Sequence, residues 1–395
     1  MKDEIFIEIH YSNIKKYNQN ISGDHFLTKR EKNNSRIISV LSDGLGSGVK
    51  AKVLATLTST MAANYIQNFK DIKKSAKTIL QTLPVCNIRK ISYATFTIVE
   101  IKNKDVRIIE YDNPDFILTL NDKIIDINKK NLTGILNNKR KYELKLSQFK
   151  AQYGNRIIFF SDGVSQAGMG TKKFPIGWGL ESIKSFVSEI IKEQPEISAF
   201  NLSEKIIRMA QRLDQNKAKD DITCGVIFFR KPRKLLFISG PPIDKSKDRE
   251  IAEHIKNFNG QIVICGGTTS KIVARELGKK IKFNLDLNNI DPEIPPTSSI
   301  DGIDLVTEGT ITLGKTVEYL EKYSNFSNIK SNPVIKLINI LLNNDKIYFL
   351  IGTKINEAHQ DPNIPIELEI RRNIIKKMIS LLEEKFLKET ELKFI

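Results

Sequence analysis

The sequence predicts two domains of different classes, an α+β domain followed by an α/β domain. The first half of the chain is rich in apolar strand patterns, among which lie a few long helical patterns. A charged stretch that contains a proline, Arg230-Lys231-Pro232-Arg233-Lys234, comes next. Beyond it, strand and helix patterns alternate, which is typical of a small doubly wound sheet. We therefore expect one domain over residues 1–232 and another over residues 233–395.

The elements of the first domain follow from alternating and helical spacing of apolar residues. Strands are expected over 5–9, 21–30, 36–41, 93–101 and 106–111, and a weaker meander to about 126. Buried strands are expected over 156–160 and 222–229. Helices are expected over 48–69, 71–83, 180–193 and 199–213.

In the second domain, strands and helices are expected to alternate along the chain. Its strands are predicted over 235–239, 262–265, 303–307 and 347–351. Its helices are predicted over 247–258, 269–278 and 313–323, and a long terminal helix over 366–387. Alternation of this kind favours a parallel sheet with helices on both faces.

Composition excludes several classes of protein. The 395 residues are 40% hydrophobic and 27% charged, as in ordinary globular chains. The net charge is +16, but the lysines are dispersed and aromatic residues are not interleaved with them, so nucleic-acid binding is not favoured. A basic surface instead attracts acidic partners such as phosphoproteins.

Targeting signals are also absent from the sequence pattern. No apolar run reaches the roughly 18 residues of a membrane span, and the start Met-Lys-Asp-Glu does not resemble a signal peptide. Three distant cysteines, Cys86, Cys224 and Cys265, exclude a disulfide framework and a structural zinc cluster. We expect a cytoplasmic protein without membrane attachment.

Aspartates occur where strands of the first domain begin or end. Asp24 lies in the second strand, Asp43 ends the third, Asp162 follows the buried strand, and Asp220-Asp221 precede the last. Two bare carboxylates ~4 Å apart repel by about 4 kcal/mol at an effective dielectric constant of ~20. Several that converge need a divalent cation, and oxygen ligands favour Mg²⁺ or Mn²⁺. A single Asp-Gly is usually a turn, but the joint pattern predicts a site.

These aspartates lie in motifs that carry a family resemblance. The motifs are, in order, Ser22-Gly23-Asp24, Ser42-Asp43-Gly44-Leu45-Gly46-Ser47-Gly48, Tyr93-Ala94-Thr95-Phe96, Phe160-Ser161-Asp162-Gly163-Val164 and Asp220-Asp221-Ile222-Thr223. Together they resemble the SpoIIE-like serine phosphatases of the metal-dependent type 2C protein phosphatase superfamily, over about residues 1–230.

The resemblance implies a fold and an activity. The fold would be an α-β-β-α sandwich, two antiparallel sheets flanked by helices. The activity would be hydrolysis of phosphoserine or phosphothreonine on a protein partner by a water activated between two Mn²⁺ or Mg²⁺ ions. The resemblance implies a phosphoprotein partner, for which a protein of the anti-sigma-factor-antagonist type is one candidate, and it is compatible with a homodimer.

The resemblance also implies roles for individual residues. Asp43 matches the bridging ligand, and Gly44 matches the residue whose carbonyl binds one ion. Asp24 matches the upstream acidic position, and Asp162 and Asp220 the later ligands, with Asp221 as the alternative to Asp220. The catalytic set would be Asp43, Asp162 and Asp220.

Other residues near these motifs are open to more than one interpretation. The phosphate-binding arginine of many phosphatases has no certain match; the candidates are Lys15, Lys16, Lys29 and Arg30. His10 and His25 are expected to support the site or lie at the surface rather than bind metal. An ATP site of the histidine-kinase type is rejected because Leu45 occupies a required glycine position.

The second domain lies outside the resemblance. One loop of this domain follows a predicted strand and leads into a predicted helix; it contains Gly266, Gly267, Thr268 and Thr269. The loop could bind an anion at the helix N-terminus, or it could be a tight turn whose threonine caps the helix. Glu357, His359 and Asp361 lie in a polar loop that could bind a ligand or cap a helix. A regulatory role is the hypothesis for this domain. The competing hypotheses for the chain are a non-catalytic phosphoprotein scaffold and a small-molecule sensor.

Overall fold

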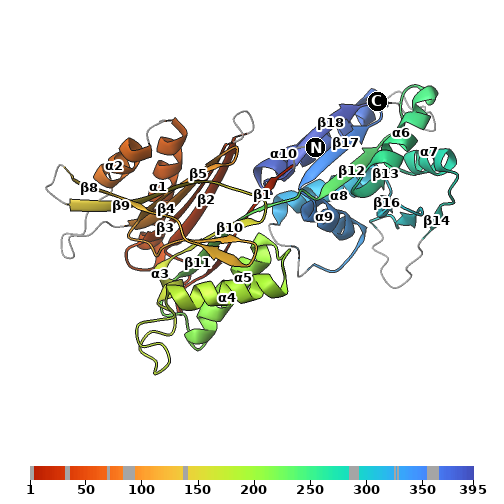
Figure 1. Ribbon diagram of the computed structural model, residues 1–395. Helices are drawn as coiled ribbons and strands as arrows, with labels where there is room; N and C mark the ends of the chain where they lie inside the picture. The colour runs from red at the N-terminus through yellow and green to blue at the C-terminus, as the bar shows by residue number, and fades with distance from the viewer. Residues whose placement is uncertain are drawn as a thin grey trace. The chain divides into compact units, whose positions relative to one another are not determined.

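The computed structural model describes residues 4–31, 36–68, 72–82, 94–136, 141–283, 293–323, 326, 329–353 and 364–395. The chain divides into two compact units, Met1–Lys231 and Pro232–Ile395, which are described separately (Figure 1). Tyr93, Cys86 and the loop with Glu357, His359 and Asp361 lie outside the described residues.

The first unit contains two antiparallel sheets. One has six strands in the order β2-β3-β4-β5-β9-β8, and the other has five in the order β1-β11-β10-β6-β7. The strands are β1 (Phe6–Ile14), β2 (Asp24–Glu31), β3 (Arg36–Gly44), β4 (Ala94–Lys102), β5 (Asp105–Tyr111), β6 (Ile117–Leu120), β7 (Lys123–Ile125), β8 (Lys130–Ile135), β9 (Lys141–Lys150), β10 (Asn155–Phe160) and β11 (Ile222–Arg230).

The two sheets pack face to face through apolar side chains of both, including Leu41, Val99, Ile157 and Phe229. Helices α1 (Gly48–Asn68) and α2 (Ile72–Thr82) cover the outer face of the six-stranded sheet. Helices α4 (Leu180–Glu193) and α5 (Ala199–Leu213) cover the outer face of the five-stranded sheet (Figure 1). The expected α-β-β-α sandwich is therefore confirmed.

The end predicted for the strand meander, at about residue 126, is too early. Strands β8 and β9 continue it to Lys150, and the alternation of Tyr142, Leu144 and Leu146 is the signal for β9. The strand expected over 21–30 begins only at Asp24. A short helix, α3 (Asp162–Ser165), follows β10 directly and therefore begins with the aspartate of the Ser-Asp-Gly motif.

The second unit is a doubly wound α/β domain. Its sheet has the order β14-β15-β16-β13-β12-β17-β18, and the five strands from β16 to β18 are parallel. The strands are β12 (Lys234–Ser239), β13 (Gln261–Cys265), β14 (Lys282–Phe283), β15 (Ser298–Ser299), β16 (Leu305–Thr307), β17 (Lys346–Ile351) and β18 (Glu389–Phe394).

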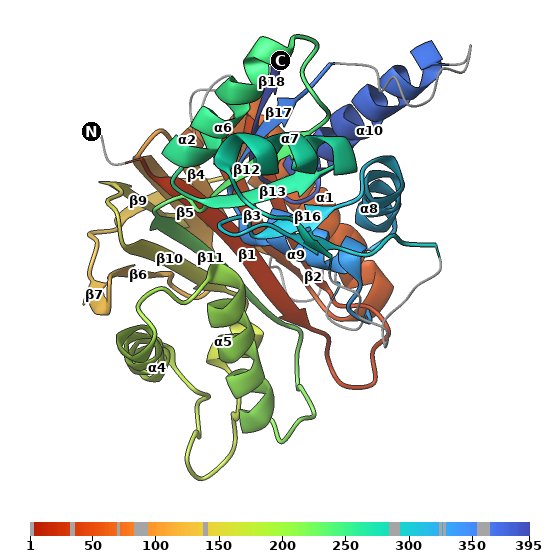
Figure 2. The ribbon, with the colours of Figure 1, turned by 90° about the vertical axis from the view of Figure 1, so that its right-hand side faces the viewer.

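Helices cover both faces of this sheet, which confirms the predicted class. The helices are η1 (Lys245–Lys247), α6 (Asp248–Asn257), α7 (Gly267–Leu277), α8 (Thr310–Lys322), α9 (Pro333–Asn343) and α10 (Ile364–Glu384). Figure 2 shows α6 and α7 together over β12 and β13, and their apolar residues form one core. Helices α8, α9 and α10 form the core on the opposite face. None of the helices in the described ranges has the length and apolarity of a membrane span.

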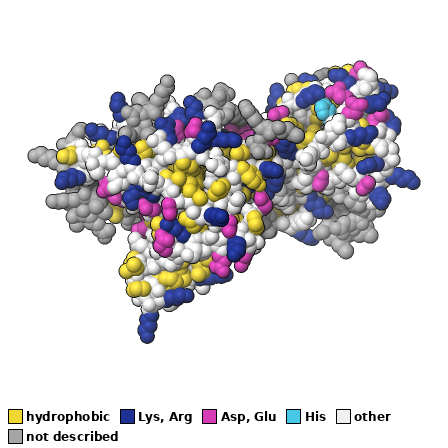
Figure 3. Space-filling model, viewed as in Figure 1, with side chains coloured by type: hydrophobic (Ala, Val, Ile, Leu, Met, Phe, Trp, Pro, Cys, Tyr) yellow, Lys and Arg dark blue, Asp and Glu magenta, His cyan; other side chains and the backbone are white. Residues whose placement is uncertain are grey.

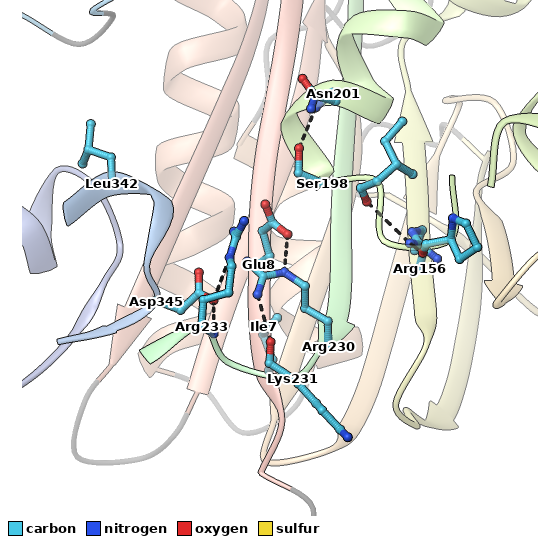
Figure 4. A network of polar contacts seen from close by, with 12 residues as sticks. Ile7, Glu8, Arg156, Ser198, Asn201, Arg230, Lys231, Arg233, Leu342 and Asp345 are labelled. Atoms are coloured by element: carbon cyan, nitrogen blue, oxygen red, sulfur yellow. Dashed lines mark hydrogen bonds and ion pairs between the residues drawn. The ribbon is translucent and has the colours of Figure 1, made fainter. Parts of the chain in front are cut away.

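Each unit anchors its own end of the connecting segment (Figure 4). In the first unit, Arg230 Nε donates to Glu8 Oε2 at 2.6 Å. In the second unit, the backbone N–H of Arg233 donates to Asp345 Oδ2 at 2.7 Å. The chain thus passes from the last strand of one unit to the first strand of the next within three residues.

Candidate active site

The site begins with two aspartates on neighbouring strands. Asp24 opens β2 and Asp43 lies near the end of β3, and the antiparallel register places them directly opposite each other. Residues directly opposite in such a pair point to the same face of the sheet. After β3 the chain turns through Gly46 and Gly48, which both have positive φ, and enters α1. The register and the turn together place both carboxylates beside the start of α1.

Asp24 is buried, and burial disfavours the charged form of its carboxyl group. It is 2% exposed, and its pKa is raised to about 7, mainly by burial and in part by the charges of Asp221 and Asp162. Hydrogen bonds from two hydroxyls lower the pKa of Asp24 in part. The Thr223 side chain makes one of them, and Ser161 Oγ donates the other to Asp24 Oδ2 at 2.8 Å. No donor from the described part of the chain reaches Asp24 Oδ1.

Asp43 lies at the centre of the cluster. Its pKa is raised well above the usual value by burial, and then by the charges of Asp24, Asp162 and Asp220. The interaction of its carboxyl group with that of Asp24 also raises the pKa of Asp43, whereas the interaction with Asp43 lowers the pKa of Asp162. Carboxyl groups that act on one another in this way are stabilised by a shared proton, or by a cation that takes the place of that proton.

Asp162 and Asp220 complete the set from the other sheet. Burial and the charge of Asp220 raise the pKa of Asp162. Gln166 Nε2 donates to Asp162 Oδ2 at 3.0 Å, whereas Asp162 Oδ1 is buried without a donor from any residue described. Burial also raises the pKa of Asp220, which is partly offset by the backbone N–H of Asp221 and by Lys16, 3.9 Å away.

Asp221 has a different environment from Asp220. Its Oδ1 accepts the backbone N–H of Lys16 at 2.9 Å, and its Oδ2 accepts that of Gly23 at 2.8 Å. The Asp221 residue as a whole is 4% exposed, whereas the side chain of Asp220 is 45% exposed. Both oxygens of Asp221 therefore hold the segment before β2 in place, whereas the charge of Asp220 acts on Asp43 and Asp162.

Two glycines allow the backbone to approach closely around the carboxylates. A Cβ on Gly44 would lie 2.1 Å from the carbonyl oxygen of Ala51 in α1. A Cβ on Gly163 would lie 2.1 Å from the carbonyl oxygen of Asp221. Any side chain at these positions would displace α1 from β3 or α3 from β11. The glycines of both Asp-Gly motifs are thus required by packing.

The basic residues named from the sequence are separated by the fold. Lys16 lies beside Asp220, but Lys29 Nζ donates to Asn64 at 2.6 Å and Arg30 Nη2 donates to the Ile7 carbonyl at 2.7 Å. Lys52, on α1, was not a candidate; its Nζ donates to the Asp24 carbonyl at 2.6 Å. Burial lowers the pKa of Lys52, against the charges of Asp24 and Asp221.

The two histidines face other partners. His25 Nδ1 lies 2.6 Å from Ser59 Oγ of α1, and its pKa is lowered by burial and by Lys52. The ring of His10 packs edge-on against Phe200, 4.7 Å between centroids, and burial lowers its pKa. These contacts are consistent with the expectation that neither histidine binds metal.

The donor set fits divalent cations chemically. Of the four carboxylates, Asp24 and Asp162 have a buried oxygen without a donor among the described residues, so their negative charge is left uncompensated. A divalent cation can replace the shared protons, and oxygen ligands match Mg²⁺ or Mn²⁺. Among the described residues, no three His, Cys, Asp or Glu side chains are grouped so as to hold one metal ion.

Sequence reasoning missed three residues of the site. Ser161 directly precedes Asp162, and Thr223 ends the Asp220-Asp221-Ile222-Thr223 motif. A hydroxyl residue beside a strand-end aspartate could therefore have been predicted to donate a hydrogen bond to a carboxylate of the site, as Ser161 does to Asp24. Lys52 gave no such signal, because its contact with Asp24 depends on how α1 packs on β2.

In the second unit, the predicted anion loop lies where β13 ends and α7 begins. The helix begins at Gly267, two residues before the predicted start at 269, and Gly266 is its N-cap residue. The threonine cap that we considered is not formed, since no side chain of the described residues caps this helix.

The sequence profile of the family described as Stage II sporulation protein E (SpoIIE) matches residues 33–230, half of the chain. The chain belongs to the SpoIIE family. The resemblance to SpoIIE read from the motifs is confirmed, and the match covers most of the first unit, from residue 33 onward. The second unit lies outside the match.

Solved structures of SpoIIE-related domains are similar to this chain. The SpoIIE phosphatase domain from Bacillus subtilis is 14% identical, with a TM-score of 0.43 over 58% of this chain and 95% of that one. The RsbU and RsbW domains of a Mycobacterium tuberculosis protein are 14% identical, with a TM-score of 0.46 over 63% and 68%. RsbX in complex with magnesium is 19% identical, with a TM-score of 0.41 over 56% and 95%. No curated protein matches the chain.

Proposed function

We propose that this SpoIIE-family chain is a metal-dependent protein serine/threonine phosphatase. The observation that carries the proposal is the convergence of Asp24, Asp43, Asp162 and Asp220. Burial raises the pKa of each carboxyl group, and the charges of other members of the set raise it further at Asp24, Asp43 and Asp162. Such a cluster is destabilising by itself and is explained by a function that requires cations.

The aspartates would hold two Mn²⁺ or Mg²⁺ ions. Asp43 is the best candidate for a shared ligand, because the charges of Asp24, Asp162 and Asp220 all act on it. When bound, the pair of cations supplies an activated water and neutralises phosphate oxygens. The carbonyl of Gly44 is a further proposed ligand. Asp220 is favoured over Asp221, whose two oxygens already accept backbone N–H groups.

The remaining polar residues would position these ligands. Ser161 Oγ donates to Asp24 and accepts the N–H of Thr223, so it fixes one carboxylate relative to β11. Lys52 and Lys16 bring positive charge to either side of the cluster, where the phosphate of a substrate would be neutralised.

The proposed substrate is a phosphoserine or phosphothreonine protein, of the anti-sigma-factor-antagonist type that the family suggests. On the face shown in Figure 3, Lys and Arg side chains are scattered among other types. A scattered positive charge favours encounter with an acidic partner without a stripe for a nucleic-acid backbone. We propose a cytoplasmic location, phosphatase activity in residues 1–231, and a regulatory role for residues 232–395.

The test is release of phosphate from phosphoserine and phosphothreonine peptides by the full chain, with Mn²⁺ or Mg²⁺ and with EDTA. Turnover that EDTA removes and that Asp43→Asn lacks supports the proposal. A folded chain that binds a phosphoprotein but releases no phosphate with either ion would instead establish the non-catalytic scaffold.

A further inference from the structure

The carboxyl edge of the second unit's sheet brings two helix N-termini together. Helix α7 follows β13 and α8 follows the adjacent strand β16. Gly266 N donates to the Thr307 carbonyl at 3.0 Å. A Cβ on Gly309 would lie 3.6 Å from Gly266 Cα, so the loops before the two helices touch.

Both helices begin without a capping side chain. Gly266 and Gly309 are their N-cap residues, and neither has a side chain that could accept a first-turn N–H; no other described side chain caps them. The helices are 11 and 13 residues long. Their unpaired N–H groups and the positive ends of their dipoles therefore favour a negatively charged group at this edge.

A second observation points independently to a ligand. Thr269 and Thr312 lie in the first turns of α7 and α8, are 1% and 0% exposed, and have hydroxyls without a hydrogen-bond partner among the described residues. The Thr269 hydroxyl faces the glycine loop, since Oγ1 lies 3.2 Å from where a Cβ of Gly266 would be. By contrast, Thr316 in α8 donates to the Thr312 carbonyl at 2.7 Å. Buried hydroxyls are normally satisfied in this way.

An acidic group at the same edge makes the ligand more specific. Glu308 directly precedes Gly309, and its Oε2 is buried without a donor from the described part of the chain. The preceding residue is fixed, because Thr307 Oγ1 donates to the Glu308 carbonyl at 2.8 Å. A carboxylate accepts hydrogen bonds and repels a bare anion, so it calls for a ligand that also carries hydroxyl groups.

We propose that the edge between β13 and β16 binds a phosphate ester that bears sugar hydroxyls, that is, a nucleotide or a sugar phosphate. The phosphate binds the N–H groups at the start of α7 and the Thr269 hydroxyl. A sugar hydroxyl donates to Glu308. Ligands of doubly wound sheets bind at this carboxyl edge, because the loops and helix N-termini gather there. This site is separate from the proposed phosphatase centre and does not depend on it.

The experiment measures binding by calorimetry to the full chain that carries Asp43→Asn, in EDTA, so that the carboxylate cluster of the first unit neither holds metal nor consumes the probe. The probes are AMP, ribose 5-phosphate, inorganic phosphate and ribose. We expect AMP or ribose 5-phosphate to bind more tightly than inorganic phosphate, and ribose least. Comparison of the two esters tells a nucleotide site from a sugar-phosphate site.

Three variants test the residues. Thr269→Val should weaken the ester by about tenfold or more, since a hydrogen bond to a charged group is lost. It should also leave the free chain at least as stable, because the hydroxyl it removes has no partner. Glu308→Gln should weaken the esters but not inorganic phosphate. Thr316→Val, the matched control, removes a hydroxyl that is already satisfied within its helix and should leave affinity unchanged.

The proposal is overturned if neither ester binds, if inorganic phosphate binds as tightly as the esters, or if Thr269→Val and Glu308→Gln both bind like the parent chain.

Discussion

Asp24 and Asp43 face each other in register across β2 and β3. When both carboxylates are ionised, their negative charges repel each other. Burial raises the pKa of both. Two carboxylates on opposed residues are stabilised by a shared proton or a cation, which makes the pair the most informative place to test the proposed centre.

Asp43→Asn should abolish turnover while the fold is preserved. Asparagine resembles the protonated carboxyl group that the metal-free site favours, but it removes the charge needed to hold cations. The fall in kcat should exceed the roughly 10–100-fold loss that is typical of an outer-shell metal partner. Peptide turnover at saturating Mn²⁺, with circular dichroism as the control for folding, measures it. Unchanged kcat would exclude Asp43 as a ligand.

Asp220→Ala and Asp221→Ala should separate activity from stability. Asp220→Ala should remove metal-dependent turnover with little change in melting temperature, because its side chain is 45% exposed and held by few contacts. Asp221→Ala should lower the free energy of unfolding by about 2 kcal/mol, since it leaves the buried N–H of Gly23 and the part-buried N–H of Lys16 without an acceptor. Urea unfolding and turnover are measured for both. The opposite ranking would assign the ligand to Asp221.

Ser161→Ala should lower activity without unfolding the chain. The variant removes the hydroxyl that donates to Asp24 Oδ2 and accepts the N–H of Thr223. A loss of about 10–100-fold in metal affinity or activity is expected for such a partner. Ser185→Ala on the exposed face of α4 is the matched control. A Ser161→Ala chain with the parent's metal titration curve would show that Asp24 needs no positioning.

The metal-free chain should lose stability as the pH rises. The folded pKa of Asp24, about 7, lies above the unfolded value of about 4. The native state therefore binds the extra proton, and the stability from this group is full below about pH 4 and lost as the pH rises through about 7. Thermal unfolding in EDTA at pH 5.5 and 8 measures the loss. Asp24→Asn should flatten the pH dependence, and Mn²⁺ should stabilise the parent more at pH 8. An equal pH dependence of the parent and Asp24→Asn would contradict the raised pKa.

Residues 1–231 should fold alone and retain metal-dependent phosphatase activity. This unit contains Asp24, Asp43, Asp162 and Asp220, and it is compact by itself. Limited proteolysis of the full chain should cut near Lys231, and the fragment 1–231 should release phosphate at a rate similar to the full chain without effectors. An insoluble fragment would mean that the units share a core.

Local signals in the sequence were enough for the parts of the site that lie in motifs. Asp at the ends of apolar strands is unfavourable unless it has a function, so Asp43 and Asp162 could be predicted from their positions alone. The preference for Asp220 over Asp221 came from the family pattern and not from a local signal. The hydrogen bonds of Asp221 to Lys16 N and Gly23 N, across about 200 residues of chain, depend on the tertiary fold. The contact of Lys52 with Asp24 is set by the packing of α1 on β2 in the same way.

The fold was predictable where apolar periodicity was strong. Helix α4 has the predicted bounds, and β11 extends the predicted strand by one residue. Helix α9 was missed although Asn332 caps it and Pro333 follows as the first helical residue, both ordinary start signals. Strand β18 was missed because its side chains are mostly exposed and charged; its register with β17 is a tertiary property.

The position of β11 has a consequence for how the chain folds during synthesis. β11 is the last strand of the first unit but lies between β1 and β10, and it pairs Phe6 with Arg230, a separation of 230 − 6 = 224 residues. At a synthesis rate of roughly 5–20 residues per second, β1 remains without its partner strand for on the order of ten seconds or more while the rest of the unit is made. Such long-range pairing is slow to form. Because Asp220 also precedes β11, the carboxylate cluster assembles in the same late step, and a nascent chain shorter than about 230 residues contains all the earlier motifs without a completed catalytic centre.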